Sequence, residues 1–413
     1  MKPYLDLLRR EKDFRRTYLG QLIALGGDWF AIVPLLILLP GLTGSGVWGA
    51  MVLAVDTLVF ALVGPYAGTV VDRLDRRRVV VVANTVAGLS ALLLVLVRSE
   101  TTAWIALVAI SLVAGAKSFS QPAATAAIPN LVDPEDLSTA SVLNGASWGT
   151  MLAVGAALGG LVAGTLGTTV CFVLDAGLLL GAAALTASTT RPFSDPSAPA
   201  RERRPARQDI AEALGYARRE KRVLALITCK SGPAFGNGAL SLFPLYGAAA
   251  FGLGELGIGL MFSARGVGAL VGPLVMRRRA TDPQLLYTVL ASSMAVFGLG
   301  YLALGVTDWF WLVLVLLVIA HAGGGANWIL STYGLQTVVP DTLRGRVFST
   351  DYTLATLVIA GSQVAFGLAS DHVAARTLLA VAGGMVLVYA GLWWLATRRL
   401  RRPAPSEIPV EES

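Results

Sequence analysis

Twelve apolar runs, each about 20 residues long or longer, follow one another along this 413-residue chain. Such a run is long enough to cross the hydrocarbon core of a bilayer as an α-helix. The chain is 55% hydrophobic and only 14% charged, so one soluble core could not bury all of its apolar surface. The sequence therefore predicts an all-α membrane protein with twelve transmembrane helices. We place them at about 18–40, 47–71, 78–97, 102–125, 140–165, 168–188, 222–248, 254–276, 284–305, 309–334, 347–370 and 374–397.

The basic residues are distributed asymmetrically between the two expected membrane faces. Of the 33 Lys and Arg residues, 28 fall in segments on one face and three in apolar spans, whereas only Arg98 and Arg376 fall on the opposite face. Cytoplasmic loops carry such an excess of Lys and Arg, so we expect both termini in the cytoplasm. The asymmetry also accounts for the net charge of +7 without a nucleic-acid partner. Arginine outnumbers lysine by 28 to 5 and alanine is abundant, which favours a GC-rich bacterial genome and hence a bacterial inner membrane.

A polar stretch at 189–221 separates the first six spans from the last six. Its first part, 191–205, is rich in Pro, Ser and Arg and is typical of a flexible linker. Its second part begins with the N-cap residue Asp209 and has apolar residues at helical spacing, which predicts a short amphipathic helix. That helix could lie along the inner membrane surface or be a solvated linker helix. The expected units are a half at 1–188, the linker at 189–221, a second half at 222–398 and a cytoplasmic tail at 399–413.

Two short motifs recur in the same order in both halves. Val63-Gly64-Pro65 returns as Val271-Gly272-Pro273, and Pro134-Glu135-Asp136-Leu137 returns as Pro340-Asp341-Thr342-Leu343. The offsets are 208 and 206 residues. Nearly equal offsets between spans of matching order predict two six-helix halves related as parallel repeats.

Four arginines and two aspartates are packed into the short segment 68–79. The segment resembles the loop between the second and third helices of major facilitator transporters, with the pattern G-x-x-x-D-R/K-x-G-R/K-R/K-x-V. Asp75 stands where that family usually has glycine. The resemblance implies the major facilitator fold, with a loop that gates the inner face against the start of the span at 347–370. The matching residues are Gly68, Asp72, Arg73, Arg76, Arg77 and Val79.

Two further segments narrow this resemblance. Phe14-Arg15-Arg16, leading to Gly20-Gln21-Leu22 and Gly27-Asp28, and Pro340-x-x-Leu343-Arg344-Gly345-Arg346-Val347-Phe348-Ser349 look like one bacterial branch of the superfamily. Members of that branch include enterobactin exporters and macrolide efflux pumps. The likeness runs from about residue 14 to residue 397 and implies use in export.

Seven ionisable side chains fall inside the predicted spans. At the bilayer centre each costs at least about 2.5–3.5 kcal/mol, so each requires a structural or functional reason. At 1.5 Å of rise per residue, four of them fall near mid-depth. The four are Asp28, Asp56, Arg265 and His321, and the other three are Lys117, Asp175 and Lys230.

In the fold that the resemblance implies, helices 1, 4, 7 and 10 line a central cavity and helices 2, 5, 8 and 11 form the seam between halves. Asp28, Lys117, Lys230 and His321 are then expected to face the cavity, with Asp56 and Arg265 at the seam. Asp28, Asp56 and His321 become the candidates for proton coupling. Apolar walls with a few polar anchors suit an amphipathic ligand. The cavity candidates are Trp29, Phe30, Lys117, Phe119, Lys230, Phe235, Asn237, Asn327 and Trp328.

Each candidate also has a purely structural interpretation. Asp28 could be a buried, hydrogen-bonded carboxylate, and His321 a neutral core histidine. Asp56 and Arg265 could form an ion pair between the halves, which would still be functional if it broke during transport.

The remaining charges in the spans have structural interpretations of their own. Lys117 and Lys230 could extend towards the inner surface, away from the cavity. Asp175, on a lipid-facing helix, is expected to reach the outer interface. Asp351 is expected to be a helix-start charge.

The fifth span carries part of a pattern found in antiporters of this superfamily, G-x-x-x-G-P-x-x-G-G. The segment 151–160 keeps Gly155, Gly159 and Gly160 but lacks the first glycine and the proline. Small residues still permit close helix packing. We therefore assign Gly155 and Gly159 to the conformational change, together with a set of charged residues: Asp72, Arg73, Arg76, Arg77 and Arg265.

These observations predict a secondary transporter that exports an amphipathic small molecule, a drug or secondary metabolite, in exchange for protons. An anionic siderophore is the alternative cargo, suggested by Lys117, Lys230 and Arg265. A membrane sensor or enzyme on a transporter-like scaffold is a third hypothesis, but the sequence has no phosphate-binding loop and no nucleophile–base pairing. Cys171 and Cys229 lie far apart in different spans, which argues against a disulfide framework or metal cluster. We expect a monomer without a cofactor.

Overall fold

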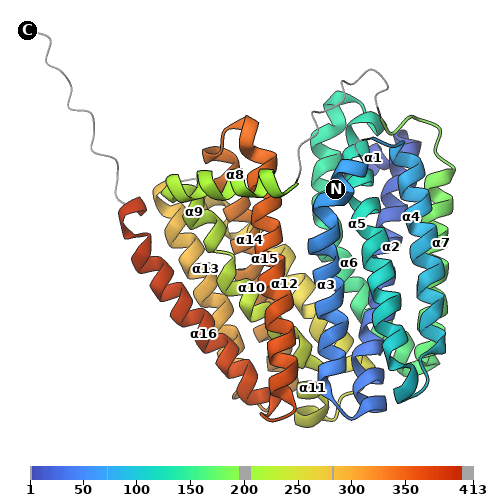
Figure 1. The fold of residues 1–413 in the computed structure, drawn as a ribbon, viewed down its shortest axis with the longest axis vertical. Coiled ribbons are helices and arrows are strands. Elements are labelled where there is room, and N and C mark those ends of the chain that lie inside the picture. Colours follow the sequence, from blue (N-terminus) through green and yellow to red (C-terminus); the bar gives the residue numbers. More distant parts are fainter. Residues whose placement is uncertain (1, 72, 195–205, 281–282, 402–413) are drawn as a thin grey trace, which may run out of the picture.

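The computed structural model describes residues 2–71, 73–194, 206–280 and 283–401. Every regular element in these ranges is a helix, and eleven helical segments are long and apolar enough to cross a membrane. They form a bundle that is divided into two halves (Figure 1). The predicted all-α membrane fold is confirmed.

The first half contains the six spanning helices that the sequence predicts. A short helix, α1 (Lys2–Arg10), precedes them. The six are α2 (Lys12–Thr43), α3 (Gly46–Val71), α4 (Arg76–Ala91), α5 (Ala103–Leu131), α6 (Leu137–Leu166) and α7 (Thr168–Ala187), with the 3₁₀ turns η1 (Leu92–Leu96), η2 (Glu100–Thr102) and η3 (Pro134–Asp136) between them.

The second half contains five continuous spans, and its first span is broken into short segments. The continuous helices are α12 (Glu255–Ala280), α13 (Pro283–Leu304), α14 (Phe310–Val338), α15 (Asp341–Ser370) and α16 (Ala375–Ala396), followed by the turn η5 (Arg398–Arg401). The broken span consists of α9 (Lys221–Thr228), α10 (Ser231–Asn237), η4 (Gly238–Leu242) and α11 (Phe243–Phe251).

Two prolines lie near the breaks in this span. Proline has no backbone N–H, so it leaves the carbonyl four residues earlier without its helical partner. Pro233 removes the bond to Cys229, where α9 ends, and Pro244 removes the bond to Leu240, within η4. The predicted helix at 222–248 is therefore a chain of short helices, and Lys230 lies at the first break.

The two halves have the same internal arrangement. In the first, α2 packs on α6 and α7, α4 packs on α5 and α7, and α3 packs on α5. In the second, α10 packs on α15 and α16, α13 packs on α14 and α16, and α12 packs on α14. Each contact in the first half recurs six spans later, so the halves are parallel repeats, as the recurring motifs predict.

The seam between the halves is formed by two helix pairs, α3 with α15 and α6 with α12. Glycines allow the backbones to meet there: a Cβ on Gly160 would lie 2.5 Å from the Glu255 carbonyl oxygen, and one on Gly259 would lie 2.4 Å from that of Ala156. Close helix contact through small residues is typical of membrane proteins. The helices α3, α6, α12 and α15 are the second, fifth, eighth and eleventh spans, which were expected to form the seam.

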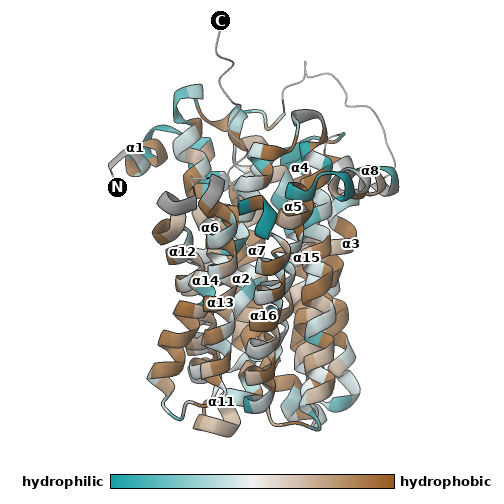
Figure 2. Ribbon diagram, turned by 90° about the vertical axis from the view of Figure 1, so that its left-hand side faces the viewer, coloured by the Kyte–Doolittle hydropathy of each residue, from teal (hydrophilic) through white to brown (hydrophobic). Residues whose placement is uncertain are grey.

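One end of the bundle, which we call the inner end, carries α1, η5 and α8 (Ala206–Arg219), and α11 marks the opposite, outer end (Figure 1). Hydrophilic residues gather at the inner end, while the length of the bundle is largely hydrophobic (Figure 2). Exposed apolar side chains such as Val82, Leu89, Val388 and Leu392 lie on α4 and α16, where lipid would cover them.

The polar stretch between the halves is only partly described. The predicted amphipathic helix is present as α8, which runs across the inner end of the second half (Figure 1). Two of its own residues, Ala213 and Ala217, are buried. The start of the expected linker is anchored, because Asp13 accepts hydrogen bonds from the backbone N–H groups of Thr190 and Arg191 at 3.1 and 2.8 Å. The expectation of a flexible linker from residue 191 is therefore wrong for its first residues, and 195–205 lie outside the described residues.

Candidate functional site

Asp28 and Lys117 form an ion pair near the middle of the first half. Asp28 lies on α2 and Lys117 on α5, and the Lys117 ammonium donates hydrogen bonds to the Asp28 carboxylate and, at 2.8 Å, to the Ala24 carbonyl. The Lys117 side chain is 6% exposed and that of Asp28 is 22% exposed. Lys117 therefore reaches across to α2 and does not extend to the inner surface.

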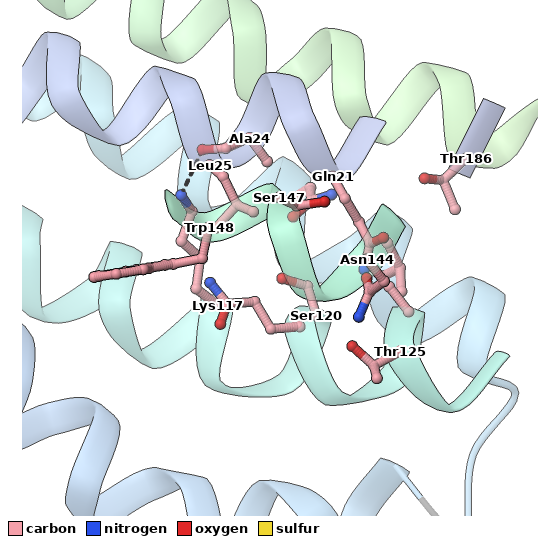
Figure 3. A pocket seen from close by; sticks show the side chains of 14 residues that line it. Gln21, Ala24, Leu25, Lys117, Ser120, Thr125, Asn144, Ser147, Trp148 and Thr186 are labelled. Carbon is pink, nitrogen blue, oxygen red and sulfur yellow. Dashed lines mark hydrogen bonds between the residues drawn. The ribbon is translucent and has the colours of Figure 1, made fainter. Parts of the chain in front are cut away.

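A cavity of about 160 Å³ lies on the inner side of this pair. Lys117 forms part of its wall, and its ammonium points to Ala24 on α2 (Figure 3). Most of the other lining groups are neutral and polar, and Trp148 supplies an aromatic surface. The lining residues come from α2, α4, α5, α6 and α7, and include Gln21, Asn84, Gln121, Asn144 and Ser147.

Three aromatic candidates of the first half lie outside this lining. Trp29 packs on Phe262 with ring centroids 5.3 Å apart, in the packed core between the halves. Phe30 is buried against Ala163 and Cys171, and Phe119 packs on a small cluster near the inner end of α4. All three stabilise helix packing in this conformation.

Asp56 and Arg265 lie on different seams and form no ion pair with each other in the described part of the chain. Asp56 is on α3, which packs on α15, and it acts electrostatically on Tyr352 of that helix. Arg265 is on α12, which packs on α6, and its guanidinium lies 5.4 Å from the ring centroid of Trp148. The expected pair is wrong for this conformation, because depth in the membrane does not identify the seam. Asp56 instead interacts electrostatically with Asp28 and Lys117.

A second ion pair joins Lys230 to Asp351 in the other half. Lys230 lies at the break between α9 and α10, and Asp351 lies on α15. Their side chains are 2% and 5% exposed, and Lys230 also donates to the Thr332 hydroxyl at 3.1 Å. The ammonium lies 5.1 Å from the ring centroid of Trp328, a cation–π contact. Asp351 is thus a buried partner of Lys230, not the helix-start charge that we expected.

The other candidates of the second half make contacts within that half. Phe235 packs on Phe366, and the Asn237 amide donates to the Pro233 carbonyl at 2.8 Å. Asn327 is 1% exposed and belongs to the buried interior. The oxygen Oδ1 of Asn237 has no hydrogen-bond partner among the described residues.

His321 lies in an aromatic cluster between α13 and α14. Its Nε2 is 3.0 Å from the Tyr301 hydroxyl, and the Phe297 ring meets it edge-on at 5.3 Å. With only 4% exposure, this arrangement supports the neutral, hydrogen-bonded interpretation.

Asp175 is 1% exposed, although we expected it to reach the outer interface. Its carboxyl group points inward from α7 against the backbone of α2, where a Cβ on Gly27 would lie 2.8 Å from Oδ1. The expectation was wrong because a helix that faces lipid on one side presents its other side to the bundle.

The basic loop is tied to its own half. The Asp75 side chain accepts a hydrogen bond from the Arg78 N–H at 2.8 Å and so caps α4, which gives a structural reason for aspartate where the family has glycine. Arg76 donates to the Ala126 carbonyl at 2.8 Å, and Arg77 donates to the Ala187 carbonyl at the end of α7. Arg73 is exposed, and Asp72 lies outside the described residues.

Gly155 and Gly159 bring α6 against α2. A Cβ on Gly155 would lie 2.8 Å from the Gly26 carbonyl oxygen, and one on Gly159 would lie 2.6 Å from that of Trp29. These glycines permit the close packing that the sequence predicts.

The contacts between the halves are concentrated towards the outer end. Ser45 and the Gly46 N–H donate to Asp371 at 2.8 and 3.2 Å, and the α6–α12 glycine contacts lie between there and mid-depth. At the inner end, the Arg10–Asp136 pair lies within one half, and Asp136 raises the pKa of Arg10. In the same region Arg346 pairs with Glu212 of α8 at 2.7 Å. Towards the outer end, Asp371 and the seam glycines therefore join the halves directly.

Sequence reasoning missed several residues of the site. Gln21, Asn84 and Asn144 line the cavity, but neutral polar residues carry no strong signal in a single sequence. Asn144 and Trp148 lie on α6, which we assigned to the seam alone. Both cysteines are buried and unpaired, and the described residues contain no group of three or more His, Cys, Asp or Glu side chains that could hold a metal ion.

Comparison with known proteins gives one family and several similar structures. The family model of the Major Facilitator Superfamily matches residues 17–353. A search of curated proteins gives no match. A bacterial homologue of the human lysosomal transporter Spinster, in an inward-facing and unoccupied conformation, is 15% identical with a TM-score of 0.72, and the match covers 98% of this chain and 100% of that chain.

Two further solved structures share the fold. A POT family transporter in complex with 5-aminolevulinic acid is 9% identical with a TM-score of 0.76, covering 95% of this chain and 97% of that chain. The human organic anion transporter MFSD10 (TETRAN) is 18% identical with a TM-score of 0.63, covering 92% and 99%. At these identities the likeness shows the fold alone.

Proposed function

We propose that this chain, which belongs to the Major Facilitator Superfamily and is a membrane transporter, exports an amphipathic small molecule in exchange for protons. Asp28 is the coupling acid, and the cavity beside it is the inner part of the substrate path. The protein acts in a bacterial inner membrane with both termini in the cytoplasm, so the inner end of the bundle faces the cytoplasm.

The observation that carries this proposal is the Asp28–Lys117 ion pair, whose lysine forms part of the cavity wall. A carboxylate in such a place has two stable states: ionised beside its lysine, or protonated and neutral. Protonation of Asp28 removes the counter-ion of Lys117 and changes the charge that the cavity presents. A bound cation would compete with the proton for the same carboxylate, which is the physical basis of exchange.

The lining of the cavity supports an amphipathic cargo. Its neutral polar side chains offer hydrogen bonds, and the half-exposed Trp148 offers a flat apolar surface. Apolar surface with a few oriented polar groups is the usual composition of a small-molecule site.

The pairing of both lysines weakens the case for an anionic cargo. That alternative assumed free positive charge, but Lys117 and Lys230 each have a carboxylate partner, and Arg265 lies over Trp148. Asp56 adds a further carboxylate near the first pair. The charges named around the site therefore balance, which removes the excess positive charge that an anionic cargo would need.

Export is supported by the resemblance of residues 14–397 to bacterial exporters. In alternating access, a cavity that opens to the cytoplasm takes up cargo there and releases it after the halves rock. The seam glycines allow the outer ends to close tightly in this state.

The test is flux in proteoliposomes that contain the purified protein, an imposed pH gradient and no ATP. The probes are ethidium as an amphipathic cation, a neutral macrolide and an anionic catecholate siderophore. We expect gradient-driven transport of ethidium or the macrolide, and a near-complete loss of gradient dependence in Asp28→Asn with probe exchange retained. Transport by Asp28→Asn at the wild-type rate under every gradient would exclude Asp28 as the coupling acid. Transport of the siderophore alone would establish the anionic alternative.

A further inference from the structure

Asp175 is a carboxyl group without a partner inside the membrane-spanning part of the protein. It is 1% exposed, and neither of its carboxyl oxygens has a hydrogen-bond partner among the described residues. An ionised carboxylate in an apolar interior costs several kcal/mol or more unless it is paired, so such a group neutralises itself. The burial and isolation of Asp175 thus indicate the protonated acid in this conformation.

Its position relates it directly to the site. Asp175 lies on α7 against the backbone of α2 at Gly27, the residue before Asp28. The other side of the same α2 segment is held by α6, where Gly155 meets Gly26 and Gly159 meets Trp29. A movement of α2 or α6 would therefore change the surroundings of Asp28 and Asp175 together.

Few charged groups face Asp175. Asp28 on α2 and Lys117 on α5 both act on it electrostatically. On α7 itself, Cys171 lies one turn nearer the outer end and is within electrostatic reach of Glu255 at the start of α12. The helix α6 contains no charged residue, and the only charges of α4 are three arginines at its inner start, Arg76, Arg77 and Arg78.

Lys117 is therefore a counter-charge that acts on both Asp28 and Asp175, and Asp56 on α3 interacts with it as well. In this conformation it pairs with Asp28, which leaves Asp175 to be neutral. If Asp28 is neutralised, the Lys117 charge is left without its partner, and an ionised Asp175 becomes less costly. The two acids are thus coupled through one lysine, and only one of them is charged at a time.

We propose that Asp175 is a second proton site, which holds a proton in this conformation and passes it to Asp28 when α2 and α7 move. The O–H bond of Asp175 breaks and an O–H bond forms on Asp28, so the negative charge moves from Asp28 to Asp175 beside Lys117. A proton from the outer side then restores Asp175, and Asp28 releases its proton to the inner side, which returns both groups to their starting states. This proposal rests on the proposed proton exchange, but the protonation of Asp175 can be measured without any cargo.

The first experiment is infrared spectroscopy of the full-length protein in lipid at neutral pH. We expect the carbonyl band of a protonated carboxylic acid in the wild type, its loss in Asp175→Asn, and a shift in Gly27→Ala, whose new methyl group meets the carboxyl. Gly177→Ala is the matched control, because nothing lies within 4 Å of its Cβ position. If Asp175→Asn does not fold, Asp175→Glu replaces it, since it keeps the acid but moves the band. A band that is absent from the wild type, or unchanged in all Asp175 variants, overturns the proposal.

The second experiment measures ethidium accumulation in proteoliposomes with the membrane potential clamped. A relay affects the rate of proton delivery but not the number of protons exchanged. We expect Asp175→Asn to slow gradient-driven uptake about tenfold, equivalent to about 1.4 kcal/mol in the barrier, and to reach the wild-type accumulation ratio. An unchanged rate, or a lost accumulation ratio, overturns the relay. If the wild type shows no gradient-driven flux of any probe, the proposed function fails, while the infrared result still decides whether Asp175 holds a proton.

Discussion

The two halves of the bundle each contain one lysine–aspartate pair, but they hold it in different settings. In the first half Lys117 lines a cavity, and the side chain of its partner Asp28 is 22% exposed. In the second half Asp351 is 5% exposed, and Lys230 is covered by Trp328 and Thr332. A pair at a cavity can exchange its partner with water, a proton or cargo, whereas a sealed pair cannot do so without opening the protein.

The helices that carry Asp28 and Lys230 differ in the continuity of their backbones. The first-half helix α2 runs unbroken for 32 residues, so Asp28 sits within a regular backbone. Its counterpart is broken at Pro233, and Lys230 lies at that break. We infer that the second-half pair holds a broken span together and that the first-half pair supplies the chemistry. The first of three predictions tests this division, and the other two test how the halves meet, from the largest expected effect to the smallest.

The largest effect is expected from Asp351→Asn. Removing one partner of a buried ion pair leaves the other charge uncompensated, which costs about 3–5 kcal/mol. Asp28→Asn should cost less, about 1–3 kcal/mol, because Lys117 keeps the Ala24 carbonyl and lies beside the cavity. The measurement is reversible unfolding of the purified protein in mixed micelles, followed by circular dichroism.

The control is the double variant Lys230→Met, Asp351→Leu. Replacing a buried ion pair with apolar residues of similar size is often neutral, so this variant should regain most of the lost stability. Equal losses in Asp351→Asn and Asp28→Asn would show that the two pairs have the same role and would remove the distinction between the halves.

The sequence predicts the fold well because the fold depends on patterns that repeat along the whole chain. Apolar length gives the spans, and two short motifs give the repeat. The one departure, the broken span at 222–248, comes from Pro233 and Pro244, which apolar length alone does not reveal.

The site is less predictable because the sequence gives the depth of a residue in the membrane but not which neighbouring helix its side chain faces. Asp56 and Arg265 have matching depths but belong to different seams. Asp351 follows the expected start of its span by only a few residues, yet α15 begins at Asp341, so about 15 Å of helix precedes it. The sequence marks Lys117 and Lys230 as charges that need a reason, but their partners depend on which helix faces meet.

The second prediction concerns how tightly the halves meet. In Gly160→Ala the new methyl group would lie 2.5 Å from the Glu255 carbonyl oxygen of the other half, so α6 and α12 must separate. Overpacking of this kind costs about 1–3 kcal/mol and should favour a conformation with open outer ends. The measurement is the distance between spin labels at Leu166→Cys and Trp309→Cys, two exposed positions near the outer end.

Gly164→Ala is the matched control on the same helix, because its Cβ position has only one atom at 4.0 Å. It should leave the distance distribution unchanged. If Gly160→Ala also leaves the distance distribution unchanged, close packing of α6 on α12 does not control how the two halves move relative to each other.

The smallest effect is expected at the outer rim, where Asp371 of the second half accepts hydrogen bonds from Ser45 and Gly46 of the first. Exposed polar contacts contribute about 0.5–1 kcal/mol, so Asp371→Ala should change the ratio of closed to open outer ends about two- to fivefold.

Asp308→Ala is the control, because the 2.6 Å contact that it removes, between Asp308 and Arg376, lies within the second half and does not cross the seam. The same pair of spin labels reports both variants, with Asp308→Ala expected to match the wild type. Equal shifts in the two variants would mean that loss of surface charge, and not the link between the halves, moves the equilibrium. A shift in Asp371→Ala alone would show that the halves are held at their outer ends by weak, reversible contacts, which is what a transporter that must reopen on that side requires.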